Sequence, residues 1–450
     1  MISITFKVLI LLVVLLSHTK FTLRLLTKLR RSEMPKTRDL VIASFLLYYD
    51  LGLLLEVCGY EYVNHFFPST FNAGNSSLEL CIAIVALSPW FIDMTAGLWH
   101  GTSRIRCKSE TTLKPRLRPA FYSTTGILSL GSVALASYFG LNQDIGKHIW
   151  VIRTVIGNTL GPYIILLFLP LYVLGFYVRL RESHSRVGVC FIVFLVLCSV
   201  TSIIPLGERT FLLMPFVIVF VFWKRTSLRG MVLIGCVSLL GAALLLPFFK
   251  WQANVKSAGI DTVSETINSD IERVPVLCDV LSRSDALGTN VLNYPGEGYV
   301  YSALFFIPRS LAPWKGYSTA TYYTAQIANS EPGGTSWGFG ISAIDELILN
   351  CGIIFLPIGL LLYGYAIRLA DAASDKYPVL LVPTRLGAVF MLGYHLPALL
   401  QSFGGMAVLA LVLHLLFCVR TRRTVTPRWL VGANPIENMS YKLSFGDHEQ

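Results

Sequence analysis

The stretch YVYSALFFIPRSLAPWKGYSTATYYTAQIANSEPGGTSWGFGISAIDELILNCGIIFLPIG, residues 299–359, joins a long polar segment to an apolar run. It carries Arg309, Lys315, Asp345 and Glu346 close to sequence that is hydrophobic enough for a membrane. Charged groups at such a place are costly unless they are paired or used. We therefore expect this stretch to contain a functional site, with the rest of the chain arranged around it.

The composition indicates a membrane protein. Of the 450 residues, 54% are hydrophobic and only 14% are charged, whereas about a quarter are charged in soluble domains. The mean hydropathy is +0.61. The net charge of +11 does not indicate nucleic acid, because the sequence has no basic helix interleaved with aromatics, no phosphate-binding glycine loop and no zinc-type Cys/His spacing.

Apolar runs predict an all-α, polytopic protein with about 11 transmembrane helices, within a range of 10–12. A crossing needs about 17 to 25 apolar residues. The runs that qualify are 2–19, 39–57, 78–98, 120–141, 154–178, 187–205, 209–223, 230–248, 341–367, 378–400 and 403–418. The first run also suits a signal peptide, but no small-residue cleavage site follows it, so we count it as a span.

The basic residues predict the orientation. Alternate segments between the spans hold 26 and nine Lys or Arg residues, and the richer set is expected inside the cell. The N-terminus is then outside and the C-terminus inside. The expected parts are a bundle over 1–248, one large outer loop over 249–340, further helices over 341–418 and an inner tail over 419–450.

The outer segment 249–340 is far longer than an ordinary connection, and long loops tend to be functional or disordered. Apolar residues three to four apart between Val263 and Leu281 suit an amphipathic helix on the membrane surface, kinked at Pro275. The second half of the segment is rich in aromatics. They suit either interfacial anchoring or a groove that stacks sugars.

Three cations in outer segments could bind phosphate. Arg209 lies in a short turn between two spans, where it either snorkels to headgroups or faces a ligand. Arg309 and Lys315 flank a turn stiffened by Pro308 and Pro313. A guanidinium and an ammonium suit a pyrophosphate at the membrane surface, although an interfacial anchor is the alternative.

A carboxylate could act beside them. Glu346 and Asn350 are four residues apart, so a helix places them on one face and Asp345 on another. Glu346 is expected to act as a general base on a sugar hydroxyl, to pair with an arginine or to cap the helix.

Other ionisable residues fall inside predicted spans, and mutual pairing is the commoner explanation for such groups. Asp50 with Arg385 is one candidate pair that the sequence does not decide. The set consists of Asp50, Glu56, Asp93, Arg385, His395 and His414.

The run IPRSLAPWKG, followed about thirty residues later by IDELILNCG, resembles the outer-face motif of the bacterial O-antigen polysaccharide polymerases, the Wzy-type oligosaccharide repeat-unit polymerases. Arg309, Pro313 and Lys315 match its first part, and Glu346, Asn350 and Gly352 match its second. The turn around Arg209 resembles that family's arginine between two spans. Gly316 stands where a proline is expected, and Ile348 where an aromatic is more usual.

The resemblance implies a GT-C-like membrane glycosyltransferase. It would join polyprenyl-diphosphate-linked oligosaccharides, as donor and acceptor, into O-antigen, capsule or exopolysaccharide at the outer face of the inner membrane. Its partners would be the bilayer, a chain-length regulator and a flippase. No DxD-like metal site is evident in the sequence, so we expect neither a metal nor a cofactor.

In that mechanism Arg209, Arg309 and Glu346 are the expected catalytic residues, with Arg and Lys side chains neutralising the departing diphosphate. The expected substrate-binding residues are Lys315, Asp345, Asn350, Arg153, Tyr301 and Trp314.

Three alternatives stay open. A lipid-linked oligosaccharide flippase would explain charges at mid-membrane, although no repeat between halves is visible. A glycan ligase would share the arginines, and an acyltransferase would need a histidine near a surface, such as His65, His100, His148 or His395.

Overall fold

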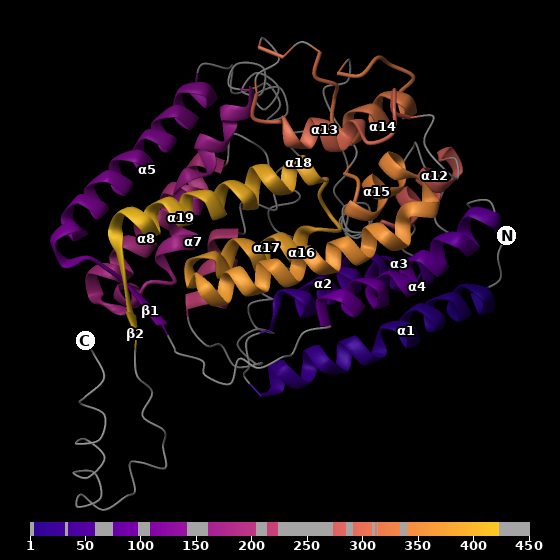
Figure 1. The fold of residues 1–450 in the computed structure, drawn as a ribbon, viewed down its shortest axis with the longest axis horizontal. Coiled ribbons are helices and arrows are strands. Elements are labelled where there is room, and N and C mark those ends of the chain that lie inside the picture. The colour runs from indigo at the N-terminus through magenta and orange to yellow at the C-terminus, as the bar shows by residue number, and fades with distance from the viewer. Residues whose placement is uncertain are drawn as a thin grey trace, which may run out of the picture.

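The computed structural model describes residues 4–31, 35–58, 75–97, 109–141, 161–203, 214–223, 273–284, 291–307, 311–312, 314–333 and 340–422. These residues are mostly helical, with one two-stranded sheet (Figure 1). The helices are α1 (Ile4–Arg30), α2 (Thr37–Phe45), α3 (Leu51–Val57), α4 (Asn75–Gly97), α5 (Arg118–Leu141), α7 (Leu169–Tyr177), α8 (Arg186–Ile203), α12 (Val274–Arg283), α13 (Glu297–Ala303), α14 (Thr319–Ile327), α15 (Ala343–Cys351), α16 (Leu356–Lys376), α17 (Leu381–Phe390), α18 (Leu396–Leu399) and α19 (Gly405–Phe417). The strands are β1 (Ser109–Leu113) and β2 (Cys418–Arg422).

Seven helical segments of the described chain are long and apolar enough to cross a membrane, so the chain is a multi-pass membrane protein. A helix satisfies most of its backbone polar groups internally, as hydrocarbon requires. The segments are Thr5–Lys28, Thr37–Val57, Ser77–Gly97, Pro115–Phe139, Arg186–Ile203, Ile353–Lys376 and Leu396–Phe417.

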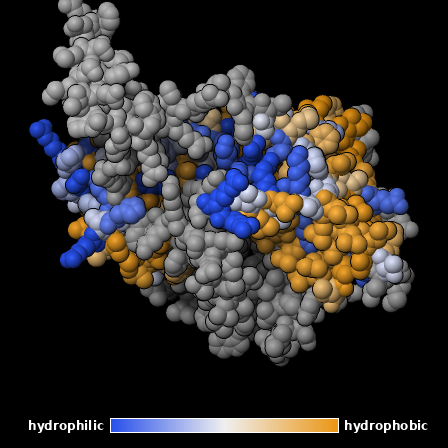
Figure 2. All heavy atoms as spheres, turned by 90° about the horizontal axis from the view of Figure 1, so that it is seen from below, coloured by the Kyte–Doolittle hydropathy of each residue, from blue (hydrophilic) through white to orange (hydrophobic). Residues whose placement is uncertain are grey.

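The exposed surface suits lipid. Figure 2 shows a broad hydrophobic area beside hydrophilic side chains on the face seen from below Figure 1. Large apolar side chains stay exposed along α1, among them Phe6, Leu9, Leu12, Leu16 and Leu23. Such a continuous apolar face in water would be a liability, whereas lipid tails cover it at no cost.

Several predicted spans differ from the observed helices. The first run continues through Lys20, Arg24 and Lys28 to Arg30, since basic residues near a helix C-terminus are favourable and do not end it. Of the run 209–223, the described part is Met214–Trp223, and 230–248 lies outside the described residues. Ile165–Tyr177 is a shorter apolar helical segment.

The two predicted spans after residue 340 are each broken. The run 341–367 divides at Gly352, whose φ of 77° ends α15 before α16 begins. The run 378–400 divides after Phe390, where a turn precedes the N-terminus of α18 at Leu396. From there α18, the π-helical turn Leu400–Gly404 and α19 form one continuous helix. Hydropathy did not reveal the breaks because the turn residues are themselves apolar.

The helix expected on the membrane surface belongs to the core. Pro275 occupies the first turn of α12, where a missing N–H costs nothing. Val274, Leu277 and Val280 are fully buried, because α12 packs against α4 and α15. Residues 263–272 of that prediction lie outside the described residues.

Strands β1 and β2 pair antiparallel and join segments that are more than 300 residues apart. Both segments were expected on the inner side of the membrane. Their pairing requires that they lie on the same side as each other. We call this the strand end of the bundle. It lies opposite the end where α12–α15 gather (Figure 1).

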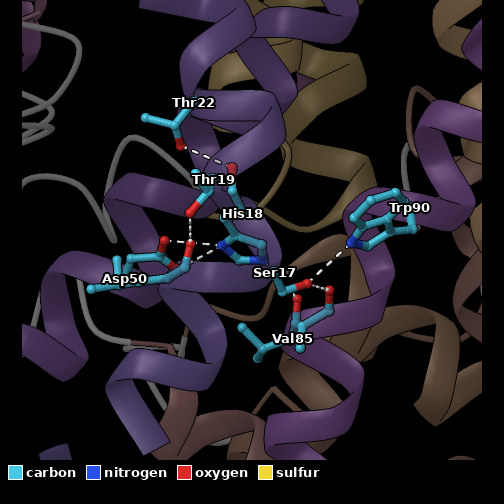
Figure 3. A network of polar contacts seen from close by, with 9 residues as sticks. Ser17, His18, Thr19, Thr22, Asp50, Val85 and Trp90 are labelled. Atoms are coloured by element: carbon cyan, nitrogen blue, oxygen red, sulfur yellow. Dashed lines mark hydrogen bonds and ion pairs between the residues drawn. The ribbon is translucent and has the colours of Figure 1, made fainter.

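A buried pair holds α1 against the π-helical turn Leu46–Asp50 (Figure 3). His18 Nδ1 lies 2.9 Å from an Asp50 carboxylate oxygen, and His18 Nε2 lies 3.1 Å from the Val85 carbonyl. Both partners of the imidazole can accept a hydrogen bond, so a proton sits between His18 and Asp50. The pair Asp50–Arg385 considered from the sequence does not form.

Candidate functional site

The two halves of the 299–359 stretch fold into one unit. Helices α13, α14 and α15 pack together, and α13 also contacts α18. Helix α15 begins at Ser342, whose hydroxyl accepts from the Asp345 N–H while the Asp345 carboxylate accepts from the Ser342 N–H. This reciprocal cap fixes where α15 starts, and so fixes the direction of Glu346 one residue later.

Glu346 joins three helices. Its Oε2 accepts a hydrogen bond from the Leu396 N–H at 2.6 Å. Leu396 lies in the first turn of α18. Its Oε1 accepts from the Thr319 hydroxyl of α14 at 3.3 Å. The carboxylate is fully buried and stands at a helix N-terminus, where negative charge is favourable.

The two Glu346 oxygens are not equivalent. Oε2 is held by a short bond, whereas the 3.3 Å contact leaves Oε1 weakly bonded. Helix α15 lies outside the seven spans. Burial raises the pKa of Glu346 to about 7, and the hydrogen bonds from Leu396 and Thr319 act in the opposite direction. A carboxylate with this pKa can accept and release a proton near neutral pH.

Asn350 connects the same helices. Its side-chain oxygen accepts from the Gly298 N–H at 2.9 Å, and its Nδ2 donates to the Thr319 hydroxyl at 3.0 Å and to the Glu346 carbonyl at 2.7 Å. A Cβ at Gly298 would overlap the Thr319 hydroxyl. Glycine is therefore required where α13 approaches α14, and the sequence-predicted pair Glu346 and Asn350 lies at the centre of this contact.

Lys315 is buried and holds the segment that precedes Arg309. Its ammonium donates to the carbonyls of Leu304, Phe305 and Ile307, at 2.9, 3.3 and 2.6 Å. The same nitrogen lies 4.9 Å from the centre of the Tyr301 ring, a cation–π contact. In this arrangement Lys315 caps the C-terminal end of α13 rather than standing free for a ligand.

Asp345 faces a different neighbourhood from Glu346, as the helical spacing predicted. Burial raises its pKa to about 6, opposed by the Ser342 hydrogen bonds and by the Arg273 charge. Arg273 donates to the Gly340 carbonyl at 3.1 Å and stacks near Tyr48. The observed role of Asp345 is therefore to cap α15.

Trp314 is 71% exposed, as are the nearby apolar side chains Phe306 and Leu311 at 59% and 76%. Tyr301, by contrast, is half-buried against Lys315. Exposed aromatic and aliphatic side chains beside polar helices are typical of the membrane interface.

Three of the expected catalytic and substrate-binding residues, Arg153, Arg209 and Arg309, lie outside the described part of the chain. So do Pro308, Pro313 and the candidate histidines His65, His100 and His148.

Sequence reasoning missed Glu297. This buried carboxylate accepts from the Tyr322 hydroxyl and from the backbone and side chain of Asn293, at 2.9 and 3.1 Å. Burial and the Glu297 contact raise the pKa of Tyr322 to about 12. A Cβ at Gly316 would strike Glu297, so the glycine found where the resemblance expects proline has a local cause.

Some of the ionisable side chains in the predicted spans form contacts of their own. Arg24 pairs with Asp39 at 3.0 Å and with Asp93 at 2.8 Å. His395 immediately precedes Leu396, whose N–H donates to Glu346. The His414 ring lies 6.0 Å from the Tyr377 ring. Among the described residues, no group of three or more His, Cys, Asp or Glu side chains is placed to hold a metal.

Comparisons with protein-family models, with curated proteins and with solved structures found no match to this chain.

Proposed function

We propose that this chain polymerises polyprenyl-diphosphate-linked oligosaccharide repeat units into a long surface polysaccharide. The reaction would take place at the outer face of the cytoplasmic membrane. The single observation that carries the proposal is the joining of the two matched segments: Asn350 and Glu346 of the second contact Gly298 and Thr319, which flank the first.

In the proposed reaction, the terminal hydroxyl of one lipid-linked repeat attacks the anomeric carbon of the other. Glu346 Oε1 takes the hydroxyl proton, and its pKa of about 7 suits that task. The leaving diphosphate departs toward Arg309 and Arg209. Lys315 and Tyr301 position the backbone that leads to Arg309 and do not bind the substrate themselves.

Because Glu346 is fully buried in this conformation, the proposed reaction requires an opening beside Thr319. The weak 3.3 Å contact between Thr319 and Oε1 is the one that a sugar hydroxyl would replace. The strong bond from Leu396 would keep the other oxygen fixed.

The test is the length distribution of surface glycan in a strain that lacks the gene and carries variants of it. Glu346→Gln keeps the shape and the acceptor for Leu396 but cannot take a proton, so we expect single repeats on the surface at unchanged protein level. Arg309→Ala should give the same result. Glu331→Gln is the matched control, because Glu331 is an exposed glutamate in the same segment, and it should give normal chains.

A transport function is favoured by one observation, the broken helix between Phe390 and Leu396 with a buried carboxylate at the break. Broken helices and mid-membrane charges are typical of transporters. If this chain moved repeats across the membrane, the Glu346→Gln strain would accumulate repeats inside and show none outside. Full-length glycan that stays on its lipid carrier would instead indicate a ligase.

A further inference from the structure

The strand end of the bundle contains two arginines that the proposed function does not use. Arg179 follows α7, just before the turn Arg181–His184 that contacts β1. Arg385 lies on α17, just after the turn Pro378–Leu380 that also contacts β1. Helices α7 and α17 pack against each other, so the two guanidinium groups are neighbours and repel one another.

The buried donors of these arginines lack acceptors. Within the described residues, Nε and Nη1 of Arg385 and Nε of Arg179 are buried without a hydrogen-bond partner. Arg179 makes one long side-chain bond, 3.3 Å from Nη1 to the Phe222 carbonyl. Burying a cation without an acceptor is unfavourable, so an anion bound at this place would stabilise the two guanidinium groups.

Three carboxylates lie near enough to act on Arg385. Arg385 is attracted through space by Asp371 and Asp375 of α16 and by Asp39 of α2. In the described part of the chain, none of these carboxylates lies within ion-pair distance of Arg385. Asp39 is bonded to Arg24 and Lys28, and Asp371 accepts from the Thr37 N–H at 3.0 Å. The described acidic groups therefore attract Arg385 from a distance without accepting a hydrogen bond from its buried Nε and Nη1.

We propose that Arg179 and Arg385 bind the phosphate group of a ligand at the strand end of the bundle. A guanidinium presents parallel N–H donors that match two oxygens of a phosphate, and two such groups can share one phosphate. Basic pockets between transmembrane helices are known to hold phospholipid headgroups, and a soluble phosphate offers the same oxygens. The site lies at the opposite end from Glu346 and is independent of the proposed function.

The experiment uses the purified full chain in an uncharged detergent and measures the thermal midpoint as each probe is titrated. The probes are inorganic phosphate, short-chain phosphatidylglycerol and, as the probe without phosphate, short-chain diacylglycerol. A ligand that binds only the folded state raises the midpoint in proportion to its saturation. The variants are Arg179→Gln and Arg385→Gln, with Arg186→Gln as the matched control, since Arg186 is an exposed arginine that starts α8.

We expect phosphate, phosphatidylglycerol or both to stabilise the wild type, and diacylglycerol not to. Arg179→Gln and Arg385→Gln should each raise the dissociation constant of the stabilising probe by about tenfold or more, because the paired donors are lost. Arg186→Gln should leave it unchanged. Response to phosphatidylglycerol alone identifies a lipid headgroup, and response to phosphate identifies a soluble ligand. Equal affinities in all three variants, or equal stabilisation by diacylglycerol, would overturn the proposal.

Stability without any probe separates binding from a structural role. Removing a buried, unpartnered charge should leave Arg385→Gln at least as stable as the wild type in the absence of phosphate. If that variant does not fold, Arg385→Lys keeps the charge and loses the planar pair of donors, and it should bind phosphate more weakly. If Arg385→Lys and Arg179→Gln, each as a single variant, both bind phosphate as tightly as the wild type, the assignment is contradicted.

Discussion

At the scale of single residues, the chemistry of this protein centres on buried carboxylates that each serve more than one helix. Glu346 bonds to α14 and to the first turn of α18, and Glu297 bonds to Tyr322 and Asn293. A buried carboxylate without such donors would be strongly disfavoured. These residues therefore support the fold, and the raised pKa of Glu346 also allows it to exchange a proton near neutral pH.

The raised pKa of Glu346 predicts a pH dependence of stability. The folded state keeps the proton up to about pH 7, whereas the unfolded chain releases it near the ordinary value of 4.5. Stability is then highest below pH 4.5 for this group and falls as the pH rises through 7, by up to about 1.4 kcal/mol per pH unit. With a pKa of about 6, Asp345 is still partly protonated in the folded state at pH 6, so a variant that removes only the Glu346 carboxyl is needed to isolate its share of the slope.

Thermal midpoints of the wild type and Glu346→Gln between pH 6 and 8 check this prediction. The variant has no proton to lose there, so the difference between the two curves isolates Glu346 from other groups. A parallel pair of curves would mean that the Glu346 pKa is not raised in the folded protein.

At the scale of elements, glycines decide where helices end and meet. Gly352 has φ 77° and ψ 168°, a combination that essentially only glycine adopts. It separates α15 from the span Ile353–Lys376, and the separation lets α15 turn back to bring Glu346 to Leu396. One residue thus changes a predicted single span into two elements with different roles.

We expect Gly352→Ala to destabilise the protein by about 1–3 kcal/mol. Gly126→Ala is the control, since Gly126 lies within α5 and a Cβ there meets nothing within 4 Å. That change should stabilise the helix by about 0.5–1 kcal/mol. Thermal unfolding in detergent measures both, and equal responses would show that the backbone at Gly352 is ordinary.

At the scale of the whole molecule, two contacts fix which parts lie at which end. The β1–β2 ribbon closes the strand end, and the Glu346–Leu396 bond closes the end of α12–α15. The core between them divides into one apolar cluster around α1, α4, α12 and α16 and another around α5, α7, α8 and α19.

The ribbon register can be tested with the natural cysteine Cys418. Leu113 lies opposite Cys418, and Thr112 lies opposite Val419 with its side chain on the other face. Leu113→Cys should therefore form a disulfide with Cys418 on oxidation, because directly opposed residues have the required separation. Thr112→Cys should not, and peptide mass spectrometry distinguishes them. Cross-linking by Thr112→Cys instead would mean a register shifted by one residue.

Part of this architecture was predictable because lipid imposes a simple rule. Length and hydropathy alone identified the multi-pass class, and a predicted apolar run overlaps each of the seven observed spans. The reason is that a segment that crosses hydrocarbon must be apolar and helical. Spacing also placed Glu346 and Asn350 on one face of a helix, with Asp345 on another. Each of these conclusions depends on neighbours within a few positions of the chain.

The sequence by itself determined the class of protein, the alternation of basic segments and the residues worth suspecting. Only the tertiary structure decided that Lys315 is enclosed by carbonyls, that Asp50 pairs with His18 instead of Arg385, and that α12 packs inside the bundle. The physical reason is range. Hydropathy and helical period act locally, whereas the partner of a buried charge is set by segments 8 to more than 300 residues away that the packing of helices brings together.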